Sequence, residues 1–124
     1  MPASAEGPNP MLSIDRSILA ELLEIMGAEA FDTALASFDA DLQTSRAALQ
    51  SAAAGGDMAA LRRTAHRIKG ILSQFGAPGA AALAHEAEVA HERELPELAA
   101  RLGANLPTVM AEVRKAAASL AAGA

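Results

Sequence analysis

The 124-residue chain contains no cysteine, tryptophan or tyrosine, and its only aromatic residues are three phenylalanines. Without cysteine, the chain can form neither a disulfide nor a thiolate metal site. Because aromatic rings are so few, the hydrophobic core has to be built from aliphatic side chains and from alanine, which occurs 33 times. Such small side chains let helices approach one another closely, so we expect a thin and tightly packed core.

The chain also lacks an excess of positive charge and any long apolar run. It carries 10 Lys and Arg residues against 15 Asp and Glu residues, for a net charge of −5. Nucleic-acid-binding proteins normally have a basic excess, so we expect no nucleic-acid partner. No apolar run approaches the roughly 20 residues that span a bilayer, and the first residues lack the pattern of a signal peptide. We therefore predict no membrane association and a cytoplasmic location.

By length, the chain fits a single domain preceded by a short lead-in. Residues 1–12 contain three prolines and few large apolar groups, which predicts a flexible N-terminal segment. From residue 13 onward, apolar residues recur every three or four positions, which is typical of amphipathic helices. We therefore expect one folded domain over residues 13–124.

The apolar spacing and the helix-breaking residues together predict five helices and no strand. The expected helices cover 13–26, 28–54, 58–75 and about 80–94, and a last stretch has Pro96 in its first turn. Pro107 falls inside this last stretch and would crowd the carbonyl of Gly103, so we expect one kinked helix, with two shorter helices as the alternative. The predicted fold class is all-α: an antiparallel four-helix bundle with a short additional N-terminal helix.

The third helix carries a histidine on its polar face. At about 100° per residue, its apolar residues share one face, while His66, Gly70 and Ser73 point away from that face. Glycine costs roughly 1 kcal/mol against alanine inside a helix, so Gly70 indicates a place where another protein needs room beside His66. A neutral imidazole is a good nucleophile, and nearby cations such as Lys69 would hold an anion there. A phosphoryl group fits this combination best.

The stretch AHRIKGILSQFGA resembles the signature of histidine-containing phosphotransfer (HPt) domains. That signature has a histidine, a hydrophobic residue two positions later, a Lys-Gly pair, and a hydrophobic-Gly pair further on. The matching residues are His66, Ile68, Lys69, Gly70, Phe75 and Gly76. The resemblance extends over most of the chain and implies a helical bundle of this size.

The resemblance also implies roles for individual residues. His66 would accept a phosphoryl group from a receiver-domain aspartate or from a kinase, with Lys69 facing the phosphate and Gly70 leaving clearance for the partner. His85 and Glu88 match a His and a Glu in the phosphotransfer domain of chemotaxis kinases. There the Glu accepts a hydrogen bond from one ring nitrogen, so that the other ring nitrogen is the nucleophile.

The expected partners are response-regulator receiver domains and a histidine kinase, which can be a hybrid kinase. We predict that the partner-facing residues surround His66; they are Arg62, Arg63, Ser73, Gln74 and Ala77. Arg62 and Arg63 would steer an acidic receiver face toward the helix. The protein would act as a monomeric phosphoryl carrier without turnover or cofactor of its own, and Mg²⁺ would sit on the receiver domain. Ile71 replaces the small residue common after the Lys-Gly pair, and we expect it to alter packing or partner choice.

Three other interpretations compete with this one. His91, Glu92 and Pro96 have the spacing of a sensor-kinase histidine box, but Glu94 stands where a basic residue is usual. We therefore expect His91 to be a partly buried residue near a helix end. A metal-binding bundle is the second alternative. Its candidate ligands would be His85, Glu88, His91 and Glu92, but the chain has no second Glu-x-x-His pair to complete a two-metal site. The third alternative stays open: a helical docking module that binds receivers or kinases without being phosphorylated.

Overall fold

The computed structural model describes residues 12–123, which form five α-helices and no strand. The all-helical prediction is confirmed. The helices are α1 (Arg16–Met26), α2 (Ala28–Ala54), α3 (Met58–Gln74), α4 (Pro78–Val89) and α5 (Leu95–Gly123). The predicted flexible segment lies outside the described residues except for Leu12, which is half-buried against the core.

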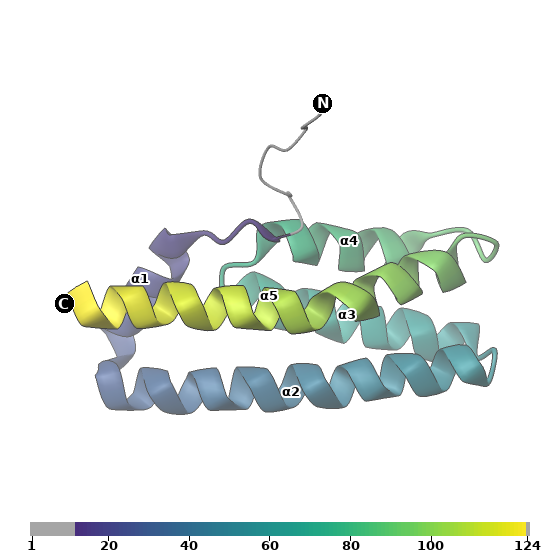
Figure 1. Cartoon of the computed structure of the whole chain (residues 1–124). Coiled ribbons are helices and arrows are strands. Elements are labelled where there is room, and N and C mark those ends of the chain that lie inside the picture. Colours follow the sequence, from purple (N-terminus) through teal and green to yellow (C-terminus); the bar gives the residue numbers. More distant parts are fainter. Residues whose placement is uncertain (1–11, 124) are drawn as a thin grey trace.

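Helices α2 to α5 pack in chain order around a shared core (Figure 1). The helix α3 contacts α2 and α4, and α5 contacts both α4 and α2. Each of the four helices therefore contacts the next one around the core, and the last contacts the first. The short helix α1 packs against α2 and α5. None of the helices in residues 12–123 is both long enough and apolar enough to cross a membrane.

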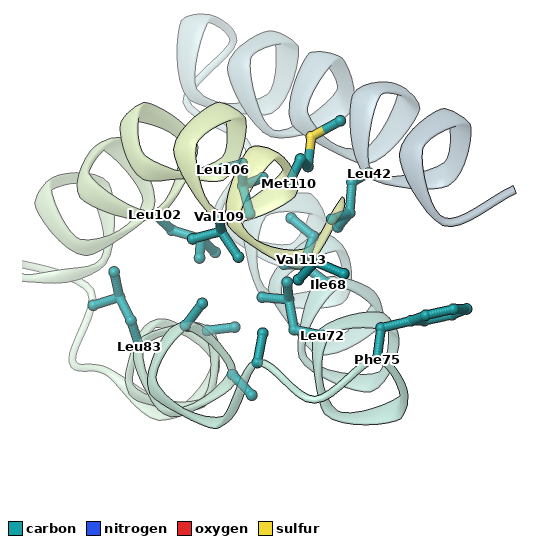
Figure 2. Packing of buried hydrophobic residues seen from close by; sticks show 14 of the residues in the cluster. Leu42, Ile68, Leu72, Phe75, Leu83, Leu102, Leu106, Val109, Met110 and Val113 are labelled. Atoms are coloured by element: carbon teal, nitrogen blue, oxygen red, sulfur yellow. The ribbon is translucent and has the colours of Figure 1, made fainter. Parts of the chain in front are cut away.

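The core is built mostly from aliphatic side chains of all four long helices, and the three phenylalanines are buried among them. Figure 2 shows Leu42 of α2, Ile68 of α3, Leu83 of α4 and Val109 of α5 among the side chains that fill the space between the helices. The predicted apolar face of α3 is confirmed because its members are all buried; they are Leu61, Ala65, Ile68, Leu72 and Phe75. Alanines fill most of the buried face of α4, which lets this helix lie close to its neighbours.

The fourth helix is shorter than predicted. We expected it to run from about 80 to 94, but α4 begins at Pro78 and ends at Val89. Proline fits the first turn of a helix because its missing N–H would have no helical partner there. At the other end, the N–H groups of Glu94 and Leu95 both donate to the carbonyl of His91. These bonds form a tight turn that leads into α5.

The segment before α1 is anchored to the turn between α3 and α4. The N–H of Asp15 donates to the carbonyl of Gly76 at 2.7 Å. Gly76 has a φ of +73°, and a Cβ at this position would lie 2.7 Å from the carbonyl oxygen of Asp15. Only glycine fits this turn without strain. Leu19 of α1 is fully buried, so the first helix is part of the packed structure.

The last helix stays continuous through Pro107. The prediction of one helix is confirmed, and Figure 1 shows α5 bending along its length. Proline has no N–H, so the carbonyl of Gly103 loses its usual partner four residues later. Arg46 of α2 replaces that partner, since its Nε donates to the Gly103 oxygen at 2.7 Å. A half-buried side chain of one helix therefore completes the hydrogen bonding of another.

We expect Arg46→Met to lower the free energy of unfolding by about 1–3 kcal/mol, because the carbonyl of Gly103 would lose its donor. Urea denaturation measures this loss. The informative control is the same substitution in a Pro107→Ala background, where the alanine N–H can bond to Gly103 within α5. Arg46→Met should cost clearly less there. An equal cost in both backgrounds would contradict this role for Arg46.

Candidate functional site

His66 lies near the middle of α3 on the face opposite the core. Its side chain is 66% exposed, as expected from its angular position on the helix. One turn further along, a Cβ added at Gly70 would meet nothing within 4 Å. The helix backbone at Gly70 is therefore open to an approaching partner. Neither packing nor an unusual backbone angle requires glycine at this position.

Glu88 of α4 connects three side chains of the site. Its Oε2 lies 2.7 Å from Nδ1 of His66, and its Oε1 accepts a hydrogen bond of 2.7 Å from Nζ of Lys69. Nδ1 of His85 lies 3.8 Å from the same Oε1. The structure therefore brings together the histidine, the lysine and the glutamate that the sequence singled out.

The charge state of Glu88 determines the tautomer of His66. The hydrogen bond from Lys69 lowers the pKa of Glu88; burial acts in the opposite direction, and the contact with His66 lowers it further. The carboxylate is therefore ionised at neutral pH and can only accept hydrogen bonds. Nδ1 of a neutral His66 must then carry the ring proton, which leaves the lone pair on Nε2.

Three arginines surround His66 on α3. Together with His66 and Glu88 they line an open surface depression of about 620 Å³, which we call the arginine hollow; its arginines are Arg62, Arg63 and Arg67. Arg62 is half-buried, and it donates to the main-chain carbonyl of Glu88 at 2.9 Å. We predicted a partner-facing Arg62, but in this structure its guanidinium is directed toward α4.

Arg67 was not among the residues singled out from the sequence. It is exposed and lines the arginine hollow beside Arg63. The signal was present, because the two arginines are four residues apart and therefore lie on adjacent turns of one helix face. The remaining partner-facing candidates on α3, Ser73 and Gln74, are both exposed. Ile71 is half-buried against the core.

Besides Arg62, two positions differ from the sequence prediction. Ala77 was predicted to face a partner, but it is fully buried. The helix α3 ends at Gln74 and the chain turns at Gly76, so the spacing of 100° per residue no longer applies at Ala77. His91 was expected to be partly buried, but it is exposed because α4 ends at Val89 and leaves it in the following turn.

The candidate metal ligands do not converge. Within residues 12–123, no group of three or more His, Cys, Asp or Glu side chains is placed to hold a metal ion. His85 and Glu88 lie near each other, but His91 and Glu92 follow the end of α4. The geometry therefore gives no support to the metal-binding alternative.

Comparison with known proteins yields one finding. The family model described as Hpt domain matches residues 29–121, which is about three quarters of the chain. The match covers α2 from its second residue, all of α3 and α4, and all but the last two residues of α5. No curated protein and no solved structure matches the chain significantly.

Proposed function

The chain belongs to the Hpt domain family, and on that premise we propose that it carries a phosphoryl group on Nε2 of His66. Hpt domains are phosphocarrier modules of two-component phosphorelays, whose partners are histidine kinases and receiver domains. The observation that carries the proposal is the contact between Nδ1 of His66 and the ionised carboxylate of Glu88. This contact leaves an exposed, unprotonated Nε2 as the nucleophile.

The proposed step is a displacement at phosphorus. The Nε2 lone pair of His66 forms the new N–P bond while the P–O bond to a receiver aspartate breaks, and its electron pair leaves with the aspartate carboxylate. The Nδ1 proton stays in place, so the ring acquires positive charge. Return of the phosphoryl group to a receiver reverses each of these changes.

Glu88 and Lys69 support this step in different ways. Because the Glu88 carboxylate is 2.7 Å from Nδ1, it stabilises the positive charge that develops on the ring. Lys69 holds the other carboxylate oxygen and adds positive charge near the incoming phosphoryl group. His85 lies at the edge of this cluster and is 57% exposed. Its proposed role is to help keep the Glu88 carboxylate in place.

The rest of the machinery belongs to the partner in this proposal. The four helices α2 to α5 act as an antiparallel bundle that presents His66, and the protein works as a monomer without a cofactor of its own. Mg²⁺ on the receiver domain neutralises phosphoryl charge during transfer. Exposed Ser73 and Gln74 extend the docking face beyond Gly70. This chain contributes mainly by positioning the nucleophile and the docking face for the transfer.

Incubation with a labelled phospho-receiver tests the proposal against the docking-module alternative. The proposal expects the label to move onto this chain in an acid-labile, base-stable form, as phosphohistidine requires. A docking module would bind the same receiver and gain no label. Binding without label would therefore overturn the proposed function.

Gly70 allows transfer and stability to be separated. Because a Cβ there meets nothing, Gly70→Ala should raise the free energy of unfolding by about 1 kcal/mol. Gly70→Gln should also fold, but its side chain would obstruct the partner and slow receiver transfer by roughly 10- to 100-fold. Labelling by the small donor phosphoramidate should be unchanged in both variants. Undiminished receiver transfer to the Gln variant would show that Gly70 provides no clearance.

A further inference from the structure

The helix that carries His66 is strongly basic in an acidic protein. The whole chain has a net charge of −5, yet α3 contains Arg62, Arg63, Arg67 and Lys69 and no Asp or Glu. Four of the ten basic residues of the chain therefore lie within eight positions around His66. A concentration of positive charge of this kind attracts anions to the helix.

Two of these four cations are already engaged. Lys69 donates to the Glu88 carboxylate, and Arg62 donates to the Glu88 main-chain carbonyl. The carbonyl of Glu88 is near the end of α4, where arginine side chains favourably replace missing helical donors. Both side chains are therefore directed toward α4.

The other two cations form no ion pair with an acidic side chain of the described part of the chain. Arg63 and Arg67 are exposed, and neither forms a salt bridge within residues 12–123. Both line the arginine hollow, as does His66. Helical side chains lean toward the preceding turn, which places the His66 ring over the part of α3 that carries Arg63. Since Glu88 contacts the ring at Nδ1, Nε2 is the ring nitrogen that remains to carry a phosphoryl group.

We propose that Arg63 and Arg67 bind the oxygens of the phosphoryl group while it is carried on Nε2 of His66. This inference rests on the proposed function and adds to it the residues that hold the carried group. Guanidinium groups suit the task because they present several fixed donors to phosphate oxygens and stay charged at every physiological pH. The arginine hollow is thus a phosphoryl-binding site of this chain, in addition to any surface that steers a receiver.

Chemical phosphorylation tests the inference without a partner protein. Phosphoramidate supplies the group: the Nε2–P bond forms, the P–N bond of the donor breaks, and ammonia leaves with its electron pair. The ³¹P signal of the phosphohistidine is then titrated with pH in the wild type and in Arg63→Gln/Arg67→Gln. The matched control is Arg101→Gln/Lys115→Gln, which removes two exposed positive charges from α5.

The proposal expects the phosphoryl group to bind its last proton more tightly in the Arg63/Arg67 variant than in the wild type. The expected increase is roughly 2- to 10-fold in proton affinity, since two exposed charged contacts are lost. The Arg101/Lys115 control should match the wild type. Equal titration in all three proteins, or equal shifts in both variants, would overturn the assignment to these arginines. If His66 accepted no phosphoryl group in the wild type, the proposed function itself would fail, and this inference with it.

Discussion

A His66→Gln variant is expected to gain no label from a phosphorylated receiver while keeping its helical circular-dichroism signal. Glutamine has no imidazole nitrogen that can form the N–P bond, so the loss of labelling should be complete. The fold should tolerate the change because the His66 side chain is 66% exposed and is not among the buried residues of α3. The measurements are label transfer over time and thermal unfolding of the same sample.

The other two histidines provide the controls for this experiment. His85→Gln and His91→Gln should both retain labelling, since each leaves Nε2 of His66 and its contact with Glu88 in place. His91 is exposed in the turn after α4, where its Nδ1 accepts a local hydrogen bond from the N–H of Arg93. Loss of label on His91→Gln alone would move the phosphorylation site away from α3 and refute the proposal.

Glu88→Gln is expected to slow transfer to His66 by roughly 10- to 100-fold without abolishing it, because losing the carboxylate that orients a histidine often has an effect of this size. The amide is of similar size but cannot offset the charge that the ring acquires. Its NH₂ group can also donate to Nδ1, which would favour the wrong tautomer. Rapid-quench measurement of transfer gives the rate, and ¹⁵N NMR of His66 reports the tautomer directly. Glu86→Gln, an exposed change on the same helix, is the matched control and should behave like the wild type.

The acid dependence of this effect has a definite sign. Because the pKa of Glu88 is lowered in the folded chain, its contacts stabilise the fold above the usual carboxyl pKa. That stabilisation is lost only as the pH falls through the lower folded value. The rate difference between wild type and Glu88→Gln should therefore persist through neutral and mildly acidic pH. A difference that vanished near neutrality would show that Glu88 is not the ionised partner of His66.

The sequence predicted the parts of the molecule that depend on a regular helical period. The apolar face of α3 and the exposed position of His66 both follow from that period, and both are confirmed. The bounds of α2 are also as predicted. The helical period no longer applies at Ala77. The chain turns at Gly76, which has a positive φ, and Ala77 is buried although the period placed it on the surface.

Contacts between helices could not be derived from the period of one helix. The partner of Arg46 is a carbonyl 57 residues away, and the carbonyl bound by Arg62 lies on α4. Each carbonyl is available because it lacks its usual helical donor. The carbonyl of Gly103 lacks one because of Pro107, and the carbonyl of Glu88 lacks one because α4 ends. The proximity of Glu88 to His66 was inferred only through the family resemblance. The structure supplies its geometry.

The packed structure includes one helix, α1, that lies outside the family match. The family match starts at residue 29, but the N–H that satisfies the carbonyl of Gly76 comes from Asp15, and Leu19 is fully buried in α1, which packs against α2 and α5. A fragment that begins at residue 29 would keep every residue of the phosphotransfer signature. It would lose the hydrogen bond from Asp15 to Gly76 in the turn that follows α3. We therefore expect a stable fragment of this chain to include Asp15 and α1.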